Sequence, residues 1–126
     1  MNAPAVSAFR DALDEHLGAL RARDVDRFAA TLGTDAAVVD GAGVLTRGTA
    51  EVLRSHAEWF RSPDPWTFDY EVIFARETAS AGLALIEATY RHTPDAEPAR
   101  FLLSLVFERD AAGAFTFVYD QNTPLR

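Results

Sequence analysis

Four side chains in this 126-residue sequence could move a proton near neutral pH: Asp40, Asp120, His16 and His56. Asp40 directly follows the apolar run 36–39, so it closes a predicted strand. A carboxylate half-buried at that point has a raised pKa and can act as a general base. The same residue could instead be a turn aspartate that caps the glycine-rich backbone after it. The sequence leaves both possibilities open.

Asp120 lies in the apolar run 117–120 of the last predicted strand. Alternation places Val118, Asp120 and Asn122 on one strand face, so a cavity that contains Val118 would contain all three. Asp120 would then be a second acid/base group. Alternatively, it lies at the open end of the strand and bonds to the backbone of 122–123.

The two histidines fall on predicted helices and could hydrogen-bond to each other, with His16 directed at a substrate oxygen. Imidazole suits that task because it donates or accepts a hydrogen bond and titrates near neutrality. Both could also be ordinary histidines at the core margin. Two histidines and Asp40 could in principle hold a metal ion, but no tight ligand spacing favours this. We therefore expect no metal and no cofactor.

The candidate catalytic residues are thus Asp40, His16 and Asp120. Aromatic residues such as Trp59 and Tyr70 are more often core or interface residues than ligand contacts, although Trp66 beside Pro65 could close a pocket mouth. The expected substrate-binding set is His56, Trp59, Phe60, Trp66, Tyr70, Leu105, Val118 and Asn122.

Hydrophobic periodicity predicts the elements that position these residues. The first helix has an apolar stripe at Val6, Phe9, Leu13, Leu17 and Leu20. Asp24 and Gly33 are expected to cap the two ends of a short second helix, and Thr49 to cap a third that ends before the prolines at 63 and 65. The predicted strands are 36–39, 44–45, 66–74, 79–91, 100–109 and 115–121.

This order predicts an α+β fold in which helices cover one face of a curved antiparallel sheet. The strand at 100–109 is apolar on both faces, so both faces must be covered. Because no helix remains for the second face, we expect a homodimer through the sheet. At this length, residues 1–126 are expected to form a single domain.

Composition excludes several function classes. The net charge of −7 argues against nucleic acid and anionic membranes as partners. Cysteine and lysine are absent, which rules out disulfides, thiolate chemistry and a Schiff-base lysine. There is no apolar run of about 20 residues, and the N-terminus does not have the composition of a signal peptide. A cytoplasmic protein is therefore expected.

The segments RARDVDRFAATLGTDAAVVDGAGVLTRGTAEV and VYDQNTP resemble the nuclear transport factor 2-like superfamily, near its ketosteroid isomerase-like and SnoaL-like branch. The resemblance implies a cone-shaped, strongly curved, mixed or antiparallel sheet whose concave face is covered by three N-terminal helices. It places Asp40 on the isomerase base, His16 on its main oxyanion donor and His56 on a supporting position. Leu105 stands where the second donor would be. Asp120 loosely matches a cyclase aspartate.

The resulting hypothesis is a cofactor-free acid/base enzyme, of isomerase or cyclase type, with a small apolar carbonyl compound such as a polyketide or terpenoid intermediate in the cone pocket. The alternatives are a non-catalytic protein that binds a hydrophobic small molecule in the same pocket, and an assembly protein that docks through its sheet. The last alternative predicts no enclosed pocket.

Overall fold

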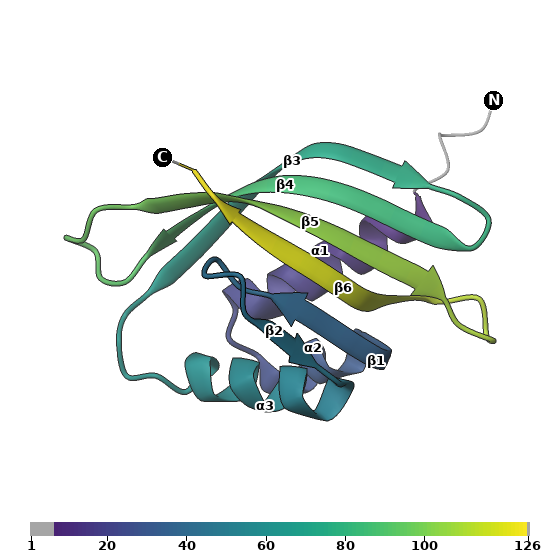
Figure 1. Ribbon diagram of the computed structural model, residues 1–126, viewed down its shortest axis with the longest axis horizontal. Coiled ribbons are helices and arrows are strands. Elements are labelled where there is room, and N and C mark those ends of the chain that lie inside the picture. Colours follow the sequence, from purple (N-terminus) through teal and green to yellow (C-terminus); the bar gives the residue numbers. More distant parts are fainter. Residues whose placement is uncertain (1–6, 126) are drawn as a thin grey trace.

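The computed structural model describes residues 7–125 (Figure 1). Its helices and strands follow the predicted order. They are α1 (Ala8–Arg21), α2 (Val25–Ala30), β1 (Leu32–Val39), β2 (Leu45–Arg47), α3 (Thr49–Phe60), β3 (Thr67–Glu77), β4 (Ala81–Arg91), β5 (Ala99–Arg109) and β6 (Phe115–Pro124).

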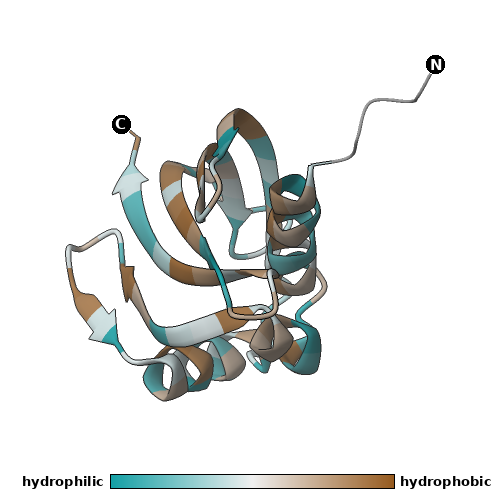
Figure 2. Cartoon of the chain, turned by 90° about the vertical axis from the view of Figure 1, so that its right-hand side faces the viewer, coloured by the Kyte–Doolittle hydropathy of each residue, from teal (hydrophilic) through white to brown (hydrophobic). Residues whose placement is uncertain are grey.

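The six strands form one sheet in the order β2-β1-β6-β5-β4-β3. β1 and β6 are parallel and all other neighbours are antiparallel, so the sheet is mixed. The long strands curve over the helices (Figure 2). The predicted α+β architecture with a curved sheet and helical cover is confirmed.

Two of the predicted helix ends differ from those in the structure. α2 ends with Thr31 as its C-cap, two residues before Gly33, because β1 already begins at Leu32. The N-cap of α3 is Gly48, at a φ of 99° that favours glycine. Thr49 instead donates to the Gly33 carbonyl at 2.6 Å and accepts from the Ala36 amide at 3.0 Å, which ties α3 to β1. α1 is capped by Ser7, and Val6 lies outside the described residues.

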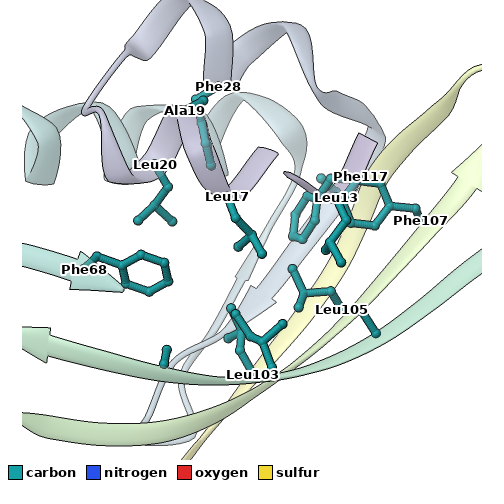
Figure 3. Packing of buried hydrophobic residues seen from close by; sticks show 14 of the residues in the cluster. Leu13, Leu17, Ala19, Leu20, Phe28, Phe68, Leu103, Leu105, Phe107 and Phe117 are labelled. Atoms are coloured by element: carbon teal, nitrogen blue, oxygen red, sulfur yellow. The ribbon is translucent and has the colours of Figure 1, made fainter. Parts of the chain in front are cut away.

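The core fills the space between α1 and the concave face of the sheet. Leu13 and Leu17 of α1 pack toward Leu105, Phe107 and Phe117 of β5 and β6 (Figure 3), and all five are at most 1% exposed. The helix approaches β4 closely: a Cβ on Gly82 would come within 2.2 Å of the Phe9 ring. Glycine is therefore required where α1 crosses this strand.

His16 belongs to this core and is only 2% exposed. Its ring stacks on Phe117 with 4.4 Å between ring centroids. Its Nδ1 lies 2.7 Å from the Thr31 hydroxyl, which itself donates to the Phe28 carbonyl. Because the only hydroxyl hydrogen of Thr31 is used in that bond, Nδ1 of His16 must be the donor to Thr31, and Nε2 carries the lone pair. Burial lowers the His16 pKa from 6.5 to about 3.

This burial predicts a specific loss of stability in acid. The folded state holds His16 neutral, whereas the unfolded chain takes up a proton below pH 6.5, so stability is lost as the pH falls from 6.5 towards 3. Between pH 7.5 and 5.0, His16→Leu should lose roughly 2 kcal/mol less free energy of unfolding than the wild type. Urea unfolding at both pH values measures this, and equal losses in the two proteins would contradict a buried neutral imidazole.

Candidate active site

A cavity of about 470 Å³ lies between α1, α3 and the sheet. Its wall is mostly apolar, with a few polar groups from β1, β2, α3 and β6. The lining residues are Leu20, Val38, Val39, Asp40, Thr46, Ser55, His56, Trp59, Phe68, Phe101, Leu103, Asp120 and Asn122. The assembly-protein alternative predicts no enclosed pocket, and this hollow is partly open to the surface.

Asp120 faces this cavity because of a β-bulge in β6. Val106 and Phe107 are neighbours on β5, yet they pair with Tyr119 and Phe117, so Val118 is an extra residue. The extra residue reverses the alternation. Phe117 faces the core before the bulge, and Asp120 faces it afterwards, paired with Leu105.

The bulge corrects the expectation that Val118 shares a face with Asp120 and Asn122. Val118 lines a separate, open hollow beside Gly33 and Thr116. Asp120 and Asn122 do share a face and both line the cavity. The Asn122 Oδ1 is buried without a hydrogen-bond partner in the described part of the chain, and it lies against Gly41 of the β1–β2 hairpin.

The Asp120 side chain is the least solvated carboxyl group of the site, at 9% exposure. Desolvation alone raises its pKa from 3.8 to about 7, and no hydrogen-bond or charged partner within residues 7–125 opposes this. A carboxyl group with that pKa is present in both protonation states at neutral pH. It can therefore accept and return a proton.

Asp40 lies at the exposed rim of the cavity, and its carboxylate stabilises the β1–β2 hairpin turn by accepting hydrogen bonds. Its Oδ1 accepts from the backbone amides of Ala42 at 2.9 Å and Val44 at 3.0 Å. Asp110 makes the same pair of bonds in the β5–β6 turn, to Ala112 at 2.9 Å and Ala114 at 3.0 Å. The geometry therefore favours the second of the two possibilities, a turn aspartate, over a half-buried base.

The two histidines do not bond to each other, which corrects the expected pair. The Phe28 ring lies between them, 4.9 Å from His16 and 4.7 Å from His56 by ring centroids. His56 donates its Nδ1 hydrogen to the Val52 carbonyl at 2.8 Å, and burial lowers its pKa. Of the two, only His56 lines the cavity, so His16 is not placed to meet a substrate oxygen.

The expected substrate-binding set divides into two groups. His56, Trp59 and Asn122 line the cavity. Phe60, Trp66 and Leu105 are buried in the core instead, and Tyr70 donates its hydroxyl to Asp14 on α1. Trp66 supports the cavity wall from behind, because it stacks on Trp59 with 4.3 Å between ring centroids.

Sequence reasoning missed most of the apolar wall. The residues it did not select are Leu20, Val38, Val39, Thr46, Ser55, Phe68, Phe101 and Leu103. Alternation along the strands carries the signal for Phe68, Phe101 and Leu103, since each lies on the inward face with other core residues. In residues 7–125 no group of three metal-ligating side chains comes together, and no helix is long and apolar enough to cross a membrane.

The profile of the SnoaL-like domain family matches residues 10–121. The chain therefore belongs to the SnoaL-like family, within the nuclear transport factor 2-like superfamily that the sequence resembled. A search of curated proteins finds no significant match.

Solved structures share the fold at low sequence identity. A candidate calcium/calmodulin-dependent protein kinase type II association domain from Thiobacillus denitrificans is 18% identical, with 98% of this chain and 100% of that chain covered and a TM-score of 0.82. A candidate dehydratase of the nuclear transport factor 2-like family from Streptomyces avermitilis is 15% identical (94% of each chain, TM-score 0.80). A ketosteroid isomerase-like protein from Erwinia carotovora atroseptica is also 15% identical (94% and 95%, TM-score 0.78). These likenesses show the fold alone.

The matched turns give a direct test of the role of Asp40. Asp40→Ala and Asp110→Ala each remove two hydrogen bonds to backbone amides, so each should lower the free energy of unfolding by roughly 1–2 kcal/mol. Urea denaturation measures both losses. If Asp40→Ala abolished ligand binding or turnover and Asp110→Ala, with the same loss of stability, did not, Asp40 would be one of the reacting groups.

Proposed function

We propose that this protein is a cofactor-free proton-transfer enzyme acting on a small apolar compound of the carbonyl type, as in an isomerisation or a cyclisation. One observation carries the proposal: a carboxyl group without a partner, Asp120, faces an apolar cavity with a pKa of about 7. General bases are most effective when their pKa lies near the working pH.

In this proposal Asp120 is the acid/base group. Its ionised form removes a proton from a carbon next to the carbonyl carbon, and its protonated form returns a proton to another atom of the same molecule. Trp59, Phe68 and Phe101 hold the apolar body of the substrate against the carboxyl group and exclude water. Asn122, two residues further along β6, places an amide group in the same cavity lining.

A non-catalytic protein that binds a hydrophobic small molecule remains the second candidate, because the same cavity would serve it. The burial of Asp120 favours the enzyme. An ionised carboxyl group without a partner lowers folding stability, and a protein that only binds an apolar ligand gains nothing from it.

We also propose that a second copy of the chain covers the outer face of the sheet. Ile73 and Phe74 of β3 are 54% and 50% exposed, and Leu83 of β4 is 40% exposed. Phe74 pairs with Leu85, and Leu83 pairs with Val106, so the apolar side chains continue across β3, β4 and β5. An apolar patch of this kind on a sheet face is typical of a subunit interface.

Asp120→Asn tests the catalytic role. The variant is nearly isosteric, so the affinity for an apolar ligand should stay close to that of the wild type, while turnover should fall at least about 100-fold. In the wild type, kcat/KM should rise with pH through about 7, as Asp120 ionises. Asp110→Asn, in the β5–β6 turn and outside the cavity lining, is the matched control. Full activity in Asp120→Asn would refute the proposal.

The same variant has a stability signature that does not depend on finding a substrate. Because the folded-state pKa of Asp120 is raised, this carboxyl group contributes a loss of stability on the order of 4 kcal/mol as pH rises from about 4 to about 7, opposite in sign to the contribution of His16. The difference between the wild type and Asp120→Asn isolates it. Asp120→Asn should lack this fall. Thermal melts between pH 4 and 7 compare the two proteins, and parallel curves would show that the carboxyl group is solvated.

Charges on the sheet face test the second copy. The double variant Phe74→Glu, Leu83→Arg should elute as a monomer, whereas the wild type should have twice the chain mass by light scattering. Val44→Glu, at another exposed apolar residue (58%), is the control and should remain dimeric. A monomeric wild type at micromolar concentration would contradict the interface.

A further inference from the structure

The cavity contains an acid and no base to balance it. Its lining includes two carboxyl groups, Asp120 inside and Asp40 at the rim, and no arginine. The one imidazole in the lining, His56, is held neutral because burial lowers its pKa. An anionic ligand would therefore be repelled by the carboxylates of the lining. A cationic ligand would be attracted to Asp120, which has no other charged partner.

Two hydrogen-bond donors of the lining, both on α3, are committed to the backbone of their own helix. The Nδ1 hydrogen of His56 and the hydroxyl hydrogen of Ser55 both go to the Val52 carbonyl, at 2.8 Å and 3.1 Å. In its neutral form His56 therefore offers the cavity only the lone pair of Nε2. His16, which could have supplied a donor, is committed to Thr31 in the core. The remaining side-chain donors of the lining are the amide of Asn122, the hydroxyl of Thr46 and the indole of Trp59, all of them neutral.

The charge that forms during proton transfer determines which stabilising groups the site needs. When a carboxylate removes a proton next to a neutral ketone, the negative charge moves onto the ketone oxygen, and an apolar site must then stabilise that oxyanion with donors or cations. When the substrate is an iminium ion, the carboxylate and the cation become a neutral acid and a neutral enamine. No oxyanion forms, so the reaction does not need a cationic group, which the lining lacks.

We propose that the substrate of this site is an apolar iminium ion, the protonated nitrogen analogue of a ketone, rather than a neutral ketone. This inference rests on the proton-transfer function proposed above and specifies its substrate class. The cation would lie beside Asp120, with Trp59, Phe68 and Phe101 around it. Aromatic faces attract organic cations and tolerate their apolar substituents.

The step balances within the substrate and the carboxyl group. The Asp120 carboxylate takes the proton from the carbon next to the C=N carbon. The C–H electron pair becomes the C=C bond of an enamine, and the C=N π pair becomes the nitrogen lone pair. Protonated Asp120 then returns its proton to a carbon or to nitrogen, which regenerates the carboxylate and completes an isomerisation without an oxidant or a co-reactant.

Hydrogen exchange provides the first test. The wild-type protein at pH 7 in D2O is incubated with 2-phenyl-1-pyrroline, a stable cyclic imine, or with propiophenone, a ketone of similar size. NMR then follows deuterium entering the carbon next to C=N or C=O. After subtraction of the uncatalysed rates, we expect the imine to exchange at least about 10-fold faster than the ketone. Asp120→Asn should lose this catalysis, and Asp110→Asn should keep it.

Binding provides a test that is independent of turnover. The wild type should bind 2-phenylpyrrolidine, an ammonium ion at this pH, at least about 10-fold more tightly than its neutral ether isostere 2-phenyltetrahydrofuran. Asp120→Asn should lose that preference while it binds the ether normally. Thermal-shift or calorimetric titrations measure both.

The inference requires both preferences, so the absence of either overturns it. Ketone exchange that equals or exceeds imine exchange, and that depends on Asp120, would refute the iminium substrate and leave the proton-transfer function standing. Exchange that is equally fast in wild type and Asp120→Asn would instead refute the function on which the inference rests.

Discussion

The desolvation of one carboxyl group is the constraint on which the site depends. Asp120 lies in an apolar hollow with no partner in the described chain, and the loss of water alone raises its pKa to about 7. Burying an ionisable group in this way opposes folding. The fold tolerates the cost because Leu105, Phe107 and Phe117 around it are buried in the core and because the protonated form is available at neutral pH. A surface carboxylate in the same fold would have neither the pKa nor the water exclusion that the chemistry needs.

The sheet creates this environment through one local irregularity. The bulge at Val118 lets β6 present Phe117 to the core at one end and Asp120 to the cavity at the other. With regular alternation, Asp120 would face the outer surface of the sheet. Bulges often re-aim a side chain next to a functional site, and here the single extra residue determines the surroundings of the acid.

Sequence patterns predicted the elements and most of their order because hydrophobic periodicity is a local property. They did not predict the bulge, because it is visible only in the pairing of β6 with β5. Asp120 and Asn122 were thus placed on the cavity face through an assumed partnership with Val118 that the structure breaks. Similarly, helical spacing placed His16 beside the apolar stripe, but whether the inner end of a helix meets a cavity or solid core depends on residues remote in sequence.

The role of Asp40 could have been recognised from sequence by an internal comparison. The segments DGAGV at 40–44 and DAAGA at 110–114 have an aspartate and a glycine at the same spacing. Both fold into the same turn, with φ of 82° at Gly43 and 87° at Gly113. A turn signature that occurs twice in one chain favours a structural role for the aspartate at both places, whereas the resemblance to a catalytic position was drawn from one.

The positions of the proton donors and acceptors then limit the chemistry more closely than the fold does. α3 directs the hydrogens of Ser55 and His56 back to its own carbonyl at Val52, so these two side chains offer the cavity acceptors rather than donors. A wall without a cation suits a reaction in which charge disappears better than one in which a negative charge must be held on oxygen. The SnoaL-like fold itself does not determine whether the substrate is a cation or a neutral ketone. The tautomer of His56 and the desolvation of Asp120 are the features that favour the cation.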